Sequence, residues 1–237
     1  MNPLYRDNGI VLRTYKFGEA DRIVVLLTET HGKIRTVAKG VRKATSRLGG
    51  RLEPMSHVAA QLRRGKNLDQ ITQAEATESF HPIRTDLDRL TAGAALLEAA
   101  DLVSEERQPN DRLYRMLLGA LRTLAAQRYA LLVPAFHLKL LAADGVGPHL
   151  DSCVVCDSPG PLVAYDPDHG GALCRTCRRG LAMSEESIEL ARRVLSGGLM
   201  SALGEPASPI THEVQVMAMR AFEHHVERRL RAAHALD

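Results

Sequence analysis

The sequence contains no tryptophan, and aromatic residues make up only 4% of its 237 positions, so we expect largely aliphatic cores. No stretch approaches the ~18–20 uncharged apolar residues that a membrane-spanning helix needs. No basic segment followed by an apolar run stands near its start, as it would in a signal peptide. We therefore expect a soluble protein of the cytoplasm, with no membrane partner.

Motifs of common catalytic sites are also absent. The sequence has no phosphate-binding glycine loop of the Walker type, no Gly-x-Ser-x-Gly and no His-Glu-x-x-His, because His212-Glu213 lacks the second histidine. Asp86 and Asp88 are expected to open a helix, where acidic side chains complement the helix dipole. The sequence therefore predicts a protein that is not an enzyme.

The charge that is present is distributed unevenly. Residues 1–80 hold fourteen Lys and Arg against eight Asp and Glu, and the rest of the chain has a small excess of acid. Between residues 33 and 66 the only acid is Glu53. The cations of that window are Lys33, Arg35, Lys39, Arg42, Lys43, Arg47, Arg51, Arg63, Arg64 and Lys66. A charged run is usually a solvated surface, but cations with so little neutralising acid favour an anionic partner.

Hydrophobic periodicity divides the chain near His81-Pro82. Residues 1–80 have the pattern of five short strands, at 9–17, 22–30, 33–40 and twice within 55–77. In the third strand Ile34, Thr36 and Ala38 share one face and the cations lie on the other. This size is typical of an OB-type barrel, although an SH3-like barrel has the same pattern. Residues 40–54 are predicted to form a long flexible loop.

Residues 81–237 have the periodicity of helices instead. We expect helices at 85–106, 111–126, 131–145, 184–196 and from Thr211 into the 230s, with Asp111 as a cap of the second. The predicted fold class is multidomain α+β. It comprises an N-terminal OB-type β-barrel (1–80) and an α-helical domain (81–237) that has a cysteine-containing zinc ribbon or knuckle inserted at 150–180.

All four cysteines lie in this insert as two Cys-x-x-Cys pairs, Cys153/Cys156 and Cys174/Cys177, separated by 17 residues. The spacing is typical of a four-cysteine zinc site, in which two tight turns complete one tetrahedron. A site closed by four thiolates predicts one structural Zn²⁺ ion with no catalytic role. His169 could replace a cysteine, but four cysteines suffice.

Other uses of the cysteines are less well supported. A thioredoxin-like redox motif needs a strand–helix context that is missing here. Two disulfides are disfavoured in a reducing compartment. The segment 162–174 is expected to form a hairpin, too small to fold without metal.

A distinctive N-terminal block comprises residues 9–43, GIVLRTYKFGEADRIVVLLTETHGKIRTVAKGVRK, followed by the spacing of Ser46, Leu52 and Pro54. In this block the sequence resembles the bacterial RecO family of recombination mediators. A helical domain with a four-cysteine insert completes the order. Met55 stands where the family commonly has Phe, and some members lack the cysteines, so zinc would be structural support here.

The resemblance implies a DNA repair and recombination protein that binds single- and double-stranded DNA and anneals complementary strands at the nucleoid. It would help to load a recombinase on DNA coated with single-stranded-DNA-binding protein (SSB), with the SSB C-terminal tail and RecR as partners. Candidates for the tail site are Arg112, Arg115, Arg122 and Arg128, although the leucine stripe beside them is predicted as core. A zinc-ribbon RNA-binding protein stays an alternative, as does a metal-dependent nuclease.

The expected binding mode follows from the scarcity of aromatic residues in the barrel region, which are Tyr5, Tyr15, Phe17 and Phe80. Base stacking should then be limited, and most contacts should be to phosphate. We therefore expect weak sequence preference and strong salt dependence.

Overall fold

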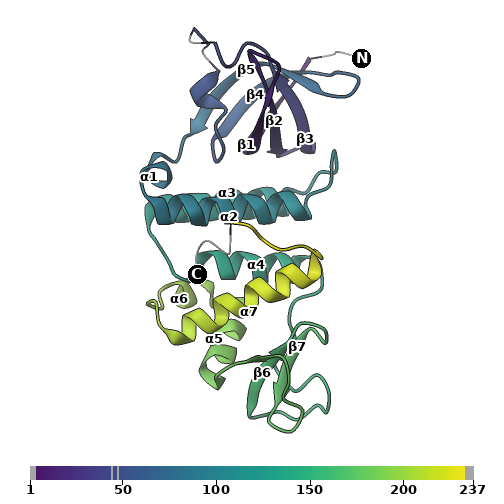
Figure 1. Cartoon of the computed structure of the whole chain (residues 1–237), viewed down its shortest axis with the longest axis vertical. Coiled ribbons are helices and arrows are strands. Elements are labelled where there is room, and N and C mark those ends of the chain that lie inside the picture. Colours follow the sequence, from purple (N-terminus) through teal and green to yellow (C-terminus); the bar gives the residue numbers. More distant parts are fainter. Residues whose placement is uncertain (1–3, 44, 47, 233–237) are drawn as a thin grey trace. The chain divides into compact units, whose positions relative to one another are not determined.

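A computed structural model of the chain describes residues 4–43, 45–46 and 48–232. It contains two compact units, one ending at Ala126 and one beginning at Gln127 (Figure 1). The first unit includes three helices as well as the barrel, so the domain boundary near residue 81 stays a prediction. Within the described residues, no helix is both long and apolar enough to span a bilayer.

The first unit begins with a five-stranded closed barrel, which confirms the predicted OB-type fold (Figure 1). The strands are β1 (Leu4–Phe17), β2 (Asp21–Thr28), β3 (Gly32–Ala38), β4 (His57–Arg63) and β5 (Asp69–Glu78). They close in the order β1-β2-β3-β5-β4, with β3 and β5 parallel and the other neighbours antiparallel.

Inward-facing aliphatic side chains from all five strands fill the barrel. Val24 and Leu26 of β2 and Ile34 of β3 are fully buried in one core cluster. Val41 and Leu52 belong to the same cluster. The stretch 40–54, expected to be a long flexible loop, is therefore anchored in the core near both of its ends and contains a short 3₁₀ turn, η1 (Gly49–Arg51).

Three helices complete the first unit: α1 (His81–Arg84), α2 (Leu87–Val103) and α3 (Asp111–Ala126). The leucines of the α3 stripe, Leu113, Leu117, Leu121 and Leu124, are buried, which confirms that the stripe is core. The predicted cap is wrong, because the side chain of Asn110 accepts the hydrogen bond from Leu113 N at 2.9 Å. Asp111 pairs with Arg115 instead.

The second unit contains α4 (Leu132–Ala143), α5 (Glu185–Leu195), α6 (Leu199–Leu203) and α7 (Pro209–His225). Between α4 and α5 lies a small sheet in the order β7-β6-β8, formed by β6 (Leu162–Asp166), β7 (Gly171–Cys174) and β8 (Leu181–Ala182). The predicted hairpin is confirmed. The last helix is shorter than expected, because the carboxylate of Glu223 accepts a hydrogen bond from Leu230 N at 2.8 Å where the chain turns back.

Candidate nucleic-acid interface and metal centre

The outer face of β3 has the alternation predicted from the sequence. Ile34 and Thr36 are buried, whereas Arg35 between them is exposed. Lys39, which follows the strand, is exposed as well. The side chains of Arg35 and Lys39 form no ion pair or side-chain hydrogen bond with any residue that the structure describes, so both charges are available to solvent or a ligand.

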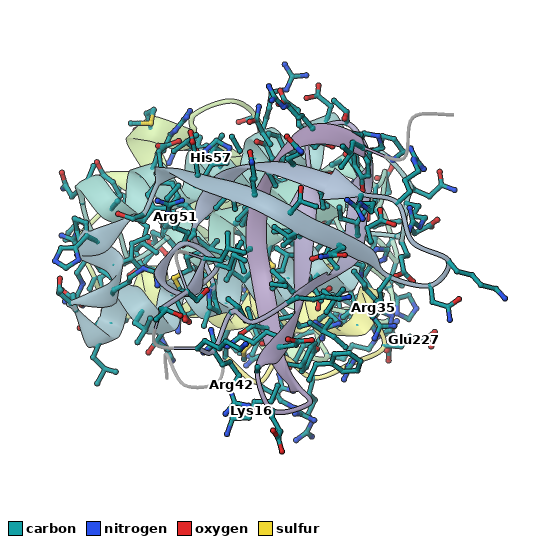
Figure 2. All side chains as sticks on the ribbon, turned by 90° about the horizontal axis from the view of Figure 1, so that it is seen from above. Lys16, Arg35, Arg42, Arg51, His57 and Glu227 are labelled. Atoms are coloured by element: carbon teal, nitrogen blue, oxygen red, sulfur yellow. The ribbon has the colours of Figure 1, made fainter. Side chains whose placement is uncertain are left out.

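The β1–β2 turn lies against the loop that follows β3. The guanidinium of Arg42 donates to the carbonyl of Glu19 at 2.9 Å, and the backbone N–H of Arg42 donates to Ala20. Gly40 N donates to the carboxylate of Asp21 at 2.7 Å, so this acid is already engaged. Figure 2 labels both Arg42 and Lys16 of β1, an exposed cation that sequence reasoning had not selected.

The β4–β5 turn holds a second group of cations near β3, because β5 is paired with β3. These are Arg63, Arg64 and Lys66, all exposed. Asp69, at the start of β5, is paired with Thr36 of β3 and fixes this turn. Its buried carboxylate accepts hydrogen bonds from Gly65 N, from Tyr5 and from Arg107. Burial alone would raise the pKa of Asp69, but these donors lower it.

Not all ten predicted cations belong to this surface. Lys33 is half-buried and pairs with Asp101 of α2, its Nζ lying 3.2 Å from the carboxylate and 2.7 Å from the main-chain carbonyl. Arg51 is part of η1, and its guanidinium donates to the carbonyl of Ala74 at 2.9 Å, so it is held against β5. Arg47 lies outside the described residues.

Glu53 is the only acidic residue between residues 33 and 66, and it does not neutralise the remaining cations. Glu53 pairs with Arg22, at 2.7 Å. We define the cationic surface as the exposed cations on and around β3: Arg35, Lys39, Arg42, Lys43, Arg63, Arg64 and Lys66. In OB barrels, the β2–β3 face together with the β1–β2 and β4–β5 loops is the usual site of oligonucleotide binding.

The sequence pattern alone did not select the cations of β1, although their spacing was visible. Arg13 lies across β2 from Arg35, since both are in register with Val25. Alternation would have placed Arg13 and Arg35 on defined faces of their strands. It could not show that β1 and β3 are both neighbours of β2.

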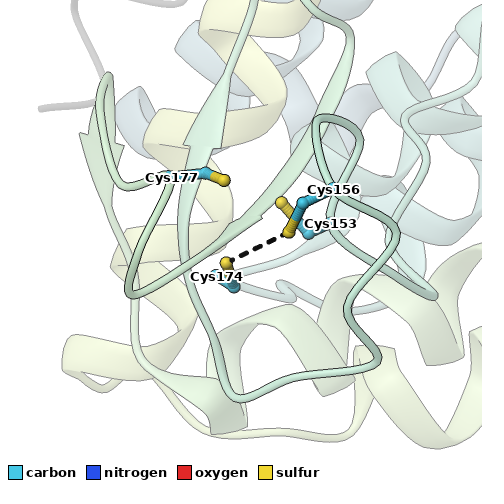
Figure 3. A group of neighbouring side chains, drawn as sticks. All are labelled: Cys153, Cys156, Cys174 and Cys177. Atoms are coloured by element: carbon cyan, nitrogen blue, oxygen red, sulfur yellow. Dashed lines mark hydrogen bonds between the residues drawn. The ribbon is translucent and has the colours of Figure 1, made fainter.

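The four cysteines lie together in the second unit (Figure 3). All four sulfur atoms lie within 4.8 Å of one another, and those of Cys156 and Cys174 are 3.6 Å apart. Zinc–sulfur bonds of about 2.3 Å place the sulfurs of a tetrahedron about 3.8 Å apart. None of the cysteines forms a disulfide. The residues present therefore fit a four-thiolate metal site.

The cluster also favours a cation electrostatically. Burial opposes the charge of the Cys153 thiolate, but backbone N–H groups of Cys174 and Val155 help to lower its pKa to about 6. The pKa of Cys177 is raised to about 12, first by its hydrogen bond with Cys156 and then by burial. One thiol thus ionises readily while its neighbour resists, and a divalent cation would allow all four to bind as thiolates.

Backbone bonds position the two cysteine turns. Cys153 N donates to Ser158 O at 2.8 Å, and Asp157 N donates to Cys153 O at 2.8 Å, which closes the first turn. Val154 N donates to Ala172 O on β7, the strand that ends at Cys174. The alternative ligand His169 is engaged elsewhere, since its Nδ1 lies 2.9 Å from the carboxylate of Asp166.

Comparison with known proteins covers both units. Residues 1–80 match the family described as Recombination protein O N terminal, and residues 84–234 match the family described as Recombination protein O C terminal. A DNA repair protein RecO from Nocardioides sp. is 42% identical over 239 residues, covering 97% of each chain. One from Frankia casuarinae is 43% identical over 241 residues, covering 99% of each.

Proposed function

The chain belongs to the RecO family of DNA repair proteins, and on that premise we propose that its cationic surface binds the phosphates of single- and double-stranded DNA. The observation that supports this most strongly is the set of exposed cations Arg35, Lys39 and Lys43, whose side chains pair with no residue that the structure describes, at the face where OB barrels bind oligonucleotides. Contacts to phosphate fix a strand without reading its base edges.

Annealing of complementary strands follows from the same electrostatics. Two DNA strands repel each other through their phosphates, and a cationic surface that binds both lowers this repulsion. Because phosphate contacts leave the base edges free, the bound strands can still pair. We propose that the chain acts in this way on DNA coated with SSB, together with RecR, so that a recombinase can load.

The cysteine cluster has a separate role in this proposal. Cys153, Cys156, Cys174 and Cys177 would hold one Zn²⁺ ion, which supplies the cross-link that a small ribbon needs in order to fold. Four thiolate ligands leave no open position for substrate. The metal therefore stabilises the second unit, and the protein works as a mediator without catalysing a reaction.

The direct test is a triple charge reversal, Arg35→Glu, Lys39→Glu and Lys43→Glu. Arg42 is left intact because it binds the β1–β2 turn. At low salt we expect at least a tenfold loss of affinity for any DNA sequence, in fluorescence anisotropy with labelled single strands and duplexes. Annealing of complementary strands, bare or coated with SSB, should slow in parallel.

A matched control changes the net charge equally at exposed positions outside the barrel: Arg112→Glu, Arg228→Glu and Arg229→Glu. This control should bind DNA within about threefold of the unmodified protein, since local and not overall charge dominates at short range. Equal losses in both variants, with intact circular dichroism, would contradict the proposed surface. A structured RNA as competitor separates this function from that of an RNA-binding protein.

A further inference from the structure

Two aromatic side chains of β1 remain exposed on the barrel. Tyr15 is 44% exposed and Phe17 is 48% exposed. Residues two apart on a strand share a face, and the next residue on that face, Arg13, is exposed as well. Thr14 is in register with the core residue Val24, so the face of Tyr15 and Phe17 points away from the core.

The strand register places this aromatic pair beside the cationic surface. Tyr15 is opposite Ile23 of β2, and Ile23 is opposite Val37 of β3. Ile23 and Val37 are half-buried, so they form an apolar floor next to the ring. On β3, Val37 lies between Arg35 and Lys39 on the same outer face. Rings and unpaired cations thus share one continuous face of three strands.

The fold explains why part of this face is covered but not why the rings are exposed. Val25 and Leu27 also point outward, and both are almost fully buried, at 1% and 0% exposure. Asp101 of α2 pairs with Arg13 at 3.0 Å and with Lys33 at 3.2 Å, so the end of α2 lies over that half of the face. Beyond it, the described part of the chain leaves Tyr15 and Phe17 open.

One ring is held in place. The guanidinium carbon of Arg13 lies 5.4 Å from the centroid of the Tyr15 ring, within the range of a cation–π contact. Arg13 is in turn fixed by Asp101. A ring that is already ordered loses little conformational freedom when a flat ligand stacks on it.

We propose that Tyr15 and Phe17 form a platform on which unpaired bases of single-stranded DNA stack while Arg35 and Lys39 bind the flanking phosphates. The inference rests on the proposed DNA-binding function and adds a second mode of contact. Exposed aromatic rings beside cations are how sequence-tolerant single-strand binders hold bases. Stacking on the rings would also favour single-stranded over double-stranded DNA, because in a duplex each base face is covered by the neighbouring base pair.

The test uses Tyr15→Ala/Phe17→Ala in the full-length protein with three probes. These are a thymidine oligonucleotide of about 20 nucleotides, an abasic chain of the same length and a duplex. Affinity for the thymidine strand should fall at least tenfold, and affinity for the abasic chain and the duplex should change less than about twofold. Tyr15→Phe should retain binding, since the ring and not the hydroxyl is needed.

A second variant reports stacking without relying on the loss of a side chain. The chain contains no tryptophan, so Phe17→Trp introduces a single indole. Its fluorescence should be quenched by the thymidine strand and unaffected by the abasic chain. Equal response to the two probes would overturn the platform.

The outcomes separate this inference from the proposed function. If the double alanine variant binds the thymidine strand normally while the triple charge reversal does not, the platform is wrong and the cationic surface stands. If neither variant loses affinity, both are wrong. Equal losses of affinity for all three probes, with native circular dichroism, would overturn the platform, because the rings would then contribute to binding without contacting bases.

Discussion

The barrel and the cysteine ribbon are both small β structures, but they differ in what stabilises them. The barrel has five strands around an aliphatic core that includes Leu26, Ile34 and Leu62, all fully buried. The strands of the ribbon have five, four and two residues, and Cys153 and Cys174 are among its buried side chains. We therefore expect the barrel to fold through burial of apolar surface alone, and the ribbon to depend on a metal held by its four cysteines.

The same difference separates the ribbon, which has a structural role, from the outer face of the barrel, which we propose binds DNA. The barrel does not need its outer face for its own core, so cations and aromatic rings can be exposed there. In the ribbon, the cysteines and the hydrogen-bonded turns around them are used for structure. We therefore expect perturbations of the ribbon to change stability locally, and perturbations of the outer face of β3 to change binding.

The largest expected effect comes from removing the metal. Structural zinc in small modules contributes about 10–16 kcal/mol of folding free energy. Cys174→Ser, or a strong chelator, should therefore make the amides of residues 150–182 exchange rapidly while the barrel strands stay protected. Hydrogen–deuterium exchange of the full-length protein, read by mass spectrometry, measures this directly.

The control for metal removal lies in the same segment. His169 is exposed and pairs with Asp166 outside the cysteine cluster, so His169→Ala should leave the protection of the ribbon nearly unchanged. Persistent protection of the ribbon in Cys174→Ser would show that the ribbon folds without its fourth thiolate and would remove the contrast with the barrel.

The next effect tests whether the barrel is independent of the helices. Gly32 has φ +68°, and a Cβ there would lie 2.1 Å from the carbonyl oxygen of Gln108, in the α2–α3 loop. Gly32→Ala should lower the free energy of unfolding by about 2–3 kcal/mol, because the loop must move and the backbone is strained. Urea denaturation followed by circular dichroism provides the measurement.

Gly50→Ala is the matched control for that substitution. A Cβ added at Gly50 would meet no other atom within 4 Å, and the backbone there has no positive φ. We expect a change of at most about 1 kcal/mol, in the stabilising direction. If the two alanine variants unfold at the same urea concentration, the loop does not contribute to barrel stability.

A smaller effect separates structural from binding cations on one strand. Lys33→Met removes a half-buried partner of Asp101, so it should cost about 1 kcal/mol of stability and leave DNA affinity nearly unchanged. Arg35→Met should weaken DNA binding about two- to fivefold with stability unchanged. Anisotropy and urea denaturation measure the two quantities. If Lys33→Met weakened DNA binding and Arg35→Met lowered stability, the roles assigned to these two residues would be wrong.

Much of the barrel could be predicted because its pattern is local. Alternation in β3 separated Ile34 from Arg35, and the paired Cys-x-x-Cys spacing brought four cysteines together. Contacts between distant segments could not be predicted in this way. Lys33 and Asp101 are 68 residues apart, and only the packing of α2 on the barrel shows that this lysine is already paired.

The errors at helix ends have a similar cause. Asp111 and Asn110 are both acceptable caps by residue type, and only backbone geometry selects Asn110. Leu230 continues the apolar period of α7, but it is buried by a turn of the chain after His225 and not by the helix. Periodicity detects which residues are buried more reliably than it detects which element buries them.

The central claim is that unpaired cations around β3 bind phosphate, and the salt dependence of DNA binding tests it most directly. If about five phosphates are engaged, the logarithm of single-strand affinity should fall with the logarithm of salt concentration at a slope of about −3.5. In Arg35→Gln/Lys39→Gln/Lys43→Gln the slope should shrink to about −1.4. An unchanged slope in this variant would contradict the account.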